Sequence, residues 1–193
     1  MVPETVAFIR GWENFYVITG SSAAGLTGLT FVVIALASEA NMVRLSGLRT
    51  FITPIVIHFG SVLWIAALLS IPGHTAFSVA ISVIATAIAL TTYSVVTIYR
   101  MFANFKLYVP ALQDWIWNAS LPAICCMALL AAGILVQRHA LPALYLVGLV
   151  TLGMLFIGIH NAWDLAVWIT AERPGIQGGH EPKDGKSPPD APR

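Results

Sequence analysis

Four long stretches of this sequence contain no Asp, Glu, Lys or Arg, and this absence of charge limits the folds that the chain can adopt. The stretches cover residues 15–37, 51–71, 76–99 and 115–136. Each reaches the roughly 20 residues that an apolar α-helix needs to cross the hydrocarbon core of a bilayer. A fifth stretch, residues 142–170, is equally apolar except for one polar motif. We therefore predict five transmembrane helices. They cover about residues 15–38, 51–71, 76–99, 115–136 and 142–170.

The composition of the 193-residue chain agrees with this class of protein. Hydrophobic residues make up 58% of the chain and charged residues only 10%, compared with roughly 25% charged residues in ordinary soluble domains. The sequence therefore predicts an all-α integral membrane bundle whose main solvent is the lipid bilayer. We expect a short N-terminal segment at residues 1–14 and the transmembrane domain at 15–170. Residues 171–193 are expected to form a disordered tail, because they are rich in proline, glycine and charge.

The basic residues predict the orientation of the chain in the membrane. An odd number of spans puts the two termini on opposite sides. One side then holds Arg10 and Arg138. The other side holds Arg44, Arg49, Arg100, Lys106 and the four basic residues of the tail. Because basic residues concentrate in cytoplasmic loops, we expect the N-terminus outside and the C-terminus in the cytoplasm.

Small residues recur along one side of the first predicted helix. Gly20, Ala24 and Gly28 follow one another at steps of four, and Ser21 and Gly25 do the same one position over. Such residues allow two helix backbones to approach closely in lipid. We expect them to pack helices, either within the monomer or between copies of a homo-oligomer. A pore lining is the alternative that the sequence leaves open.

The polar motif of the fifth span is His-Asn-Ala-Trp-Asp, residues 160–164. His160 and Asp164 are four residues apart and so lie on one face of a helix, where a carboxylate can orient and stabilise an imidazole. An aspartate at the bilayer centre costs about 2.5 to 3.5 kcal/mol, so it normally faces the bundle interior and has a partner. Asn161 lies about 100° further round the helix and can bond another helix.

The second predicted span carries the other intramembrane histidine, His58. Counting residues from Arg49 and Arg173 predicts that His58, His160 and Asp164 lie at similar levels in the cytoplasmic half of the membrane. They would meet if the second and fifth helices pack together.

Three interpretations of this His/Asp cluster remain open. It is a structural clamp between helices, a site for a proton, an ion or a small ligand, or a pair of histidines that ligates haem or a metal ion. Ionisable groups inside a membrane are candidates for function by default, and histidine changes charge near neutral pH. Our working hypothesis is therefore a site, formed by His58, His160, Asn161 and Asp164, for movement of a proton, an ion or a small solute.

Other function classes find no support in the sequence. The chain contains no nucleophile elbow, P-loop, HExxH motif or dinucleotide-binding fingerprint, so we expect no enzyme activity and no cofactor. Cys125 and Cys126 are adjacent, a spacing that fits neither a disulfide framework nor a zinc finger, and we expect no metal. The chain has net charge +1 and no basic patch with interleaved aromatic residues, which argues against nucleic acid as a partner.

The segment before the fourth span predicts where that helix begins. Pro110 breaks any helix that continues from Arg100, and Asp114 is placed as the N-cap of the fourth helix. Trp115 and Trp117 follow, as expected of aromatic residues at a membrane interface.

Several segments together are similar to a known family. They are NFYVITGSSAAGLTGLTFVVIAL, ITPIVIHFG, YVPALQDWIW and FIGIHNAWDL. They resemble a widespread bacterial family of small multi-pass membrane proteins without an established activity, some of whose members carry the name modulator of a membrane-anchored AAA protease. The resemblance extends from Asn14 to about Thr170 and is most specific in the first helix and at His160 to Asp164. It implies a location in the bacterial inner membrane and supplies no catalytic residues.

An interaction protein is the competing functional class. In that case the His/Asp cluster only holds the bundle together, and the cytoplasmic loops and tail contact another membrane protein, for example a membrane protease.

Overall fold

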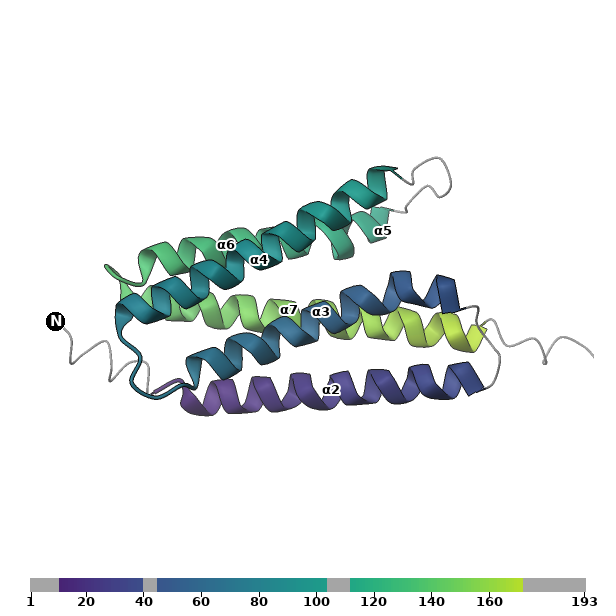
Figure 1. Ribbon diagram of the computed structural model, residues 1–193, viewed down its shortest axis with the longest axis horizontal. Helices are drawn as coiled ribbons and strands as arrows, with labels where there is room; N and C mark the ends of the chain where they lie inside the picture. Colours follow the sequence, from purple (N-terminus) through teal and green to yellow (C-terminus); the bar gives the residue numbers. More distant parts are fainter. Residues whose placement is uncertain (1–10, 40–44, 104–111, 172–193) are drawn as a thin grey trace, which may run out of the picture.

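The chain folds into helices, as a computed structural model of it shows for residues 11–39, 45–103 and 112–171 (Figure 1). The helices in chain order are α2 (Glu13–Glu39), α3 (Leu45–Leu69), α4 (Ala76–Ala103), α5 (Leu112–Trp115), the π-helix η1 (Ile116–Ser120), α6 (Leu121–Leu135) and α7 (Ala140–Ala171).

Within the described residues, five helical segments are long and apolar enough to cross a membrane. They are Glu13–Leu36, Ile52–Leu69, Ala76–Arg100, Ile116–Leu135 and Ala140–Val167. The prediction of an all-α membrane bundle with five spans is therefore confirmed. The predicted tail, from residue 172 onward, lies outside the described residues, as do Arg10, Arg44 and Lys106. The orientation of the termini stays a prediction.

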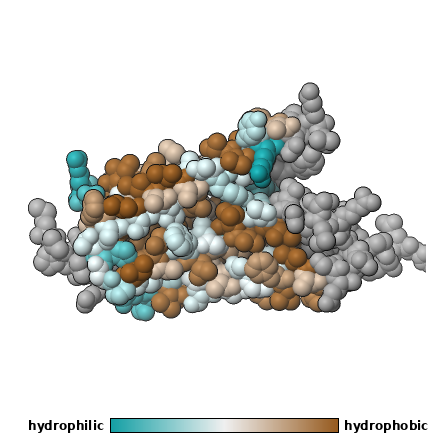
Figure 2. All heavy atoms as spheres, viewed as in Figure 1, coloured by the Kyte–Doolittle hydropathy of each residue, from teal (hydrophilic) through white to brown (hydrophobic). Residues whose placement is uncertain are grey.

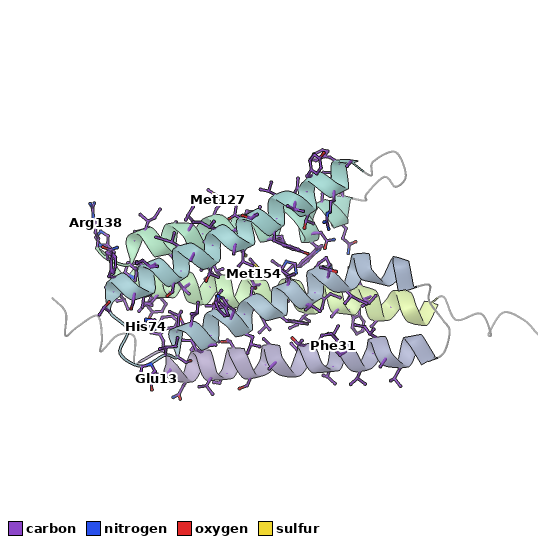
Figure 3. All side chains as sticks on the ribbon, viewed as in Figure 1. Glu13, Phe31, His74, Met127, Arg138 and Met154 are labelled. Atoms are coloured by element: carbon purple, nitrogen blue, oxygen red, sulfur yellow. The ribbon has the colours of Figure 1, made fainter. Side chains whose placement is uncertain are left out.

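The long helices form two packed groups that α7 joins. α2 packs on α3 and α3 packs on α7, while α4 packs on α6 and α6 packs on α7. In Figure 1 the α4 and α6 pair diverges from α3 and α7 towards the end of the bundle that holds α5. The core contains Phe59 of α3, Leu129 of α6 and Met154 of α7, all fully buried. Figure 3 shows Met154 inside the bundle, whereas Met127 of α6 points outward.

The outer surface of the bundle is apolar along most of its length. Large side chains that are more than half exposed include Leu29 and Phe31 of α2, Ile81 of α4, Met127 of α6 and Leu149 of α7. Figure 2 shows hydrophobic side chains spread along the bundle and hydrophilic ones gathered towards its ends. Soluble monomeric proteins rarely expose an apolar surface of this extent to water. Lipid is therefore the medium that covers it.

His74 holds the turn between α3 and α4. Its Nε2 atom lies 2.7 Å from the carbonyl oxygen of Leu68, and its Nδ1 atom lies 2.8 Å from the hydroxyl of Ser78. Thr75 caps α4, because the N–H of Ser78 donates to the Thr75 hydroxyl and the N–H of Thr75 donates to the Ser78 hydroxyl. These bonds tie together the ends of α3 and α4 at the end of the bundle that also holds Glu13 and Arg138 (Figure 3).

α2 and α3 approach each other closely at Gly20. A Cβ atom on Gly20 would lie 2.9 Å from the Cβ of Ala66, which is closer than packed carbon atoms come. A Cβ atom on Gly25 or Gly28 would meet nothing within 4 Å, and Ala24 is also exposed. Among the small residues of the first helix, Gly20 therefore packs within the chain, and Ala24, Gly25 and Gly28 lie on the outer surface of α2.

We expect Gly20→Val to lower the free energy of unfolding by about 1–3 kcal/mol, because the added side chain forces α2 away from α3. Gly60→Val on α3 is the matched control, because a Cβ atom on Gly60 would meet nothing within 4 Å, and it should change this free energy by no more than about 0.5 kcal/mol. Equilibrium unfolding in bicelles measures both variants. Equal losses of stability would contradict the close approach at Gly20.

Candidate functional site

Polar side chains gather where α5 and η1 meet α7. We call this group the α5–α7 cluster. Its members are Gln113, Trp117, Asn118, His160, Asn161 and Asp164. α7 continues from Asp164 to Ala171, or about 10 Å. The cluster therefore lies near one end of the bundle, the end at which α2, α4 and α7 all finish (Figure 1).

His160 and Asp164 form an ion pair on α7 when the imidazole is protonated. Nε2 of His160 lies 3.3 Å from Oδ2 of Asp164, because a separation of four residues puts both side chains on one face of the helix. The side chain of His160 is 21% exposed and that of Asp164 is 52% exposed. Asp164 thus does not face the bundle interior. This differs from the expectation for an aspartate inside a membrane span. Its position near the end of α7 brings it close to the polar boundary of the span, where exposure costs less.

Two side chains from the α5 and η1 segment contact the ring of His160. The indole of Trp117 lies against the imidazole, with ring centroids 3.7 Å apart and an angle of 32° between the planes. The Nε2 atom of Gln113 lies 3.5 Å from Nε2 of His160. The imidazole is therefore enclosed by an aromatic face, an amide and a carboxylate.

Asn161 connects α7 to η1. Its Nδ2 atom donates a hydrogen bond to Oδ1 of Asn118, over 3.3 Å. Asn161 thus bonds a helix other than α3 and α7. An uncharged amide pair of this kind satisfies both side chains in a medium that offers few other partners.

The π-turn of η1 presents Trp117 and Asn118 to α7. The N–H of Leu121 donates to the carbonyl of Ile116, five residues earlier, which is the bond that defines a π-helix. Pro122 lies in the first turn of α6, and a proline has no N–H and clashes with the carbonyl four residues before it. The wider π-turn makes room for the proline ring without ending the helix.

Sequence reasoning missed Gln113 and Asn118 as partners of the fifth span. Pro122, inside the fourth apolar stretch, was the signal that could have indicated an irregular turn there. The prediction that Asp114 caps the fourth span is wrong, because α5 already begins at Leu112 and the helix continues through η1 into α6. The π-turn explains this continuity.

His58 lies at the level of the cluster but makes no direct bond with it. α3 and α7 pack together at Phe59 and Gly158, where a Cβ on Gly158 would lie 2.6 Å from Cε1 of Phe59. His58 and His160 lie one and two residues from this contact towards the same end of the bundle, so they are within about one helical turn of each other along its axis. Among the described residues, no hydrogen bond, ion pair or ring contact joins His58 to His160 or Asp164.

The His58 side chain is enclosed and only partly satisfied. The residue is 4% exposed, and its Nδ1 atom has no hydrogen-bond partner within the described part of the chain. The backbone carbonyl of Pro54, one turn earlier on α3, lies beside the imidazole ring. An unsatisfied buried nitrogen is costly, and no polar side chain among the described residues offsets that cost at His58.

The cluster shares no residue with the small pocket of the bundle. This pocket lies between α3 and α4, and its lining residues are Ile65, Leu68, Leu69, Ser82, Val83, Thr86 and Leu129. Within residues 11–39, 45–103 and 112–171, no three His, Cys, Asp or Glu side chains are grouped so that they could hold a metal ion. Proton exchange and hydrogen bonding are the chemistry that the cluster residues themselves can perform.

The fold and its apolar surface define a multi-pass helical membrane protein. Comparisons of the chain with models of protein families, with curated proteins and with solved structures find no match. Membership of the bacterial family that the sequence resembles stays a prediction. The α5–α7 cluster is the feature of the structure that bears on function.

A double-mutant cycle tests the bond between η1 and α7. Asn118→Ala and Asn161→Ala should show a coupling of about 0.6 kcal/mol in the free energy of unfolding, the average for hydrogen bonds between membrane helices. Asn118→Ala combined with Gln137→Ala is the control, because Gln137 is exposed at the far end of α6, and these two changes should be additive. Equal couplings in both cycles would argue against the bond.

Proposed function

We propose that this protein moves protons into or across its membrane, alone or together with an ion or a small solute, without enzymatic chemistry. The observation that carries the proposal is the 3.3 Å separation of His160 and Asp164. An imidazole can bind a second proton, and the resulting cation donates a charge-assisted hydrogen bond to a neighbouring carboxylate. Such a pair is suited to take up a proton and to release it again.

The surroundings of the pair support this role. The face of Trp117 lies against the ring of His160, and an aromatic face attracts a cation. Asp164 is half-exposed near the end of α7, where it can exchange protons with water at the membrane boundary. His58 is buried inside the bundle and has no bond to the pair among the described residues, so the proposal rests on His160 and Asp164.

We also infer a location in a bacterial inner membrane, with the α5–α7 cluster on the cytoplasmic side. The inference rests on the resemblance of the sequence and on the greater number of basic residues at this end of the predicted spans.

Proton flux into liposomes tests the proposed function. The purified protein is reconstituted with a pH-sensitive dye inside the vesicles, and a potassium gradient with valinomycin drives proton entry. Wild-type protein should acidify the lumen, and Asp164→Asn should reduce the rate at least tenfold, because an amide cannot hold the proton or stabilise charged His160.

Glu13→Gln is the matched control for this experiment. Glu13 is an exposed carboxylate at the opposite end of the bundle, and its replacement should leave the rate within about twofold of wild type. Wild-type vesicles that leak no faster than empty ones would refute the proposal. A folded Asp164→Asn variant with the wild-type rate would refute the role of the pair.

One observation favours a second candidate function, that of an interaction protein. Trp163 is 68% exposed and lies beside half-exposed Asp164 on the surface of α7. Another membrane protein can contact both of these exposed side chains, and aromatic residues are enriched at interfaces between proteins. Absence of proton flux in folded wild-type protein would favour this candidate, including the modulator role that the family resemblance suggests.

We infer in addition that copies of the chain associate through the outer face of α2. Ala24, Gly25 and Gly28 leave a flat strip there, which allows a second helix to approach closely. Energy transfer between donor-labelled and acceptor-labelled copies in vesicles should therefore be substantial. It should fall several-fold in the Gly25→Leu, Gly28→Leu variant and stay unchanged in Ile81→Leu, a change on the outer face of α4.

A further inference from the structure

One nitrogen atom of the cluster faces two partners with opposite requirements. Nε2 of His160 lies 3.5 Å from Nε2 of Gln113 and 3.3 Å from Oδ2 of Asp164. Without a hydrogen, this nitrogen can accept a bond from the Gln113 amide. With a hydrogen, it can donate to the Asp164 carboxylate. It cannot do both at once.

A neutral imidazole can bond either partner, depending on which ring nitrogen carries its hydrogen. Protonation removes the form that accepts from Gln113. In the cation both ring nitrogens carry hydrogens, and the bond from Nε2 to the Asp164 carboxylate is charge-assisted and therefore strong. The N–H groups of Gln113 then face another N–H, and their contact is lost. If the amide turns its oxygen towards Nε2, it competes with an anion for a single hydrogen. The contact at 3.5 Å is already at the long end of the hydrogen-bond range.

The other contacts of η1 with α7 survive protonation. Asn118 bonds Asn161, and both side chains are uncharged amides. Trp117 stacks on the ring of His160, and this contact becomes stronger when the ring is a cation. η1 is therefore attached to α7 in both charge states of His160.

α5 is attached differently from η1. Gln113 links it to α7, and Trp115 links it to Phe102 of α4, with ring centroids 4.9 Å apart. When the Gln113 contact is lost, α5 remains with α4. The α4 and α6 pair already diverges from α7 at this end of the bundle (Figure 1).

We propose that protonation of His160 releases α5 from α7, with η1 as the pivot, and so opens this end of the bundle to water. The inference rests on the proposed function and deepens it. The proton that binds to His160 would itself control whether water reaches His160 and Asp164.

Other titratable groups lie on the elements around His160. α5 carries Asp114, α4 carries Tyr93, Tyr99 and Arg100, α3 carries Arg49 and His58, α6 carries Cys125 and Cys126, and α2 carries Glu39 at this end. η1 carries none. The switch is assigned to His160 because its Nε2 atom contacts a residue of α5 and a carboxylate of α7 at the same time.

Electron–electron distance measurements between spin labels test the switch. One label pair joins Leu112→Cys of α5 to Ile159→Cys of α7, in protein with Cys125→Ala and Cys126→Ala, in lipid nanodiscs. Leu112 and Ile159 are both exposed, so the labels have room. Lowering the pH from 8 to 5 should lengthen the mean distance by several ångströms. A second pair, Ile116→Cys with Ile159→Cys, reports on the pivot and should not change.

Two variants connect the movement to the proposed atoms. His160→Gln cannot gain a charge, so its Leu112 to Ile159 distance should be the same at both pH values. Gln113→Leu removes the amide on an exposed side chain, and its distance should be long at both pH values. A wild-type distance that does not change with pH would overturn the switch, as would a His160→Gln variant that responds like wild type.

Proton flux on the same samples separates this inference from the proposed function. A distance that responds to pH without any flux overturns the transport role and retains the switch. Flux that depends on Asp164, with an unchanged distance, retains the transport role and overturns the switch.

Discussion

The requirement that lipid places on the polypeptide backbone governs this structure. A bilayer core offers no water, so each N–H and C=O must find its partner within a helix. Several buried threonine and serine hydroxyls follow the same rule. Thr30, Ser61 and Thr151 donate to carbonyls three or four residues earlier on their own helices. Since these groups are satisfied locally, the helices are held together mainly by close packing.

The α5–α7 cluster departs from this pattern of local satisfaction. Asn118 and Asn161 bond across elements, and the ring of His160 is contacted by a carboxylate, an amide and an indole. A hydroxyl that bonds the backbone of its own helix does not connect that helix to another. A polar group that bonds a second helix does, and when it changes its partner the position of a helix can change. This difference makes the cluster, rather than the buried hydroxyls, the place to look for function.

A single proline connects the sequence to the geometry of the cluster. Pro122 cannot continue a regular α-helix through the preceding turn, and the chain responds with the π-turn of η1. A π-turn contains one more residue than an α-turn. It therefore rotates the side chains that precede it about the helix axis. The positions of Trp117 and Asn118 against α7 are a consequence. An irregular helical segment next to His160 and Asp164 is also a suitable pivot for movement.

The sequence by itself determined the class of this protein, the number of its spans and the common face of His160 and Asp164. These properties depend on local physics: the absence of charge over the width of a bilayer and the spacing of side chains along a helix. Only the tertiary structure decided that Gln113, Trp117 and Asn118 surround the pair, that Asp164 is half-exposed, and that Gly20 packs inside while Gly25 and Gly28 face outward. The rotation of each helix about its axis and its choice of neighbours result from packing all the helices at once, and no single stretch of sequence contains that information.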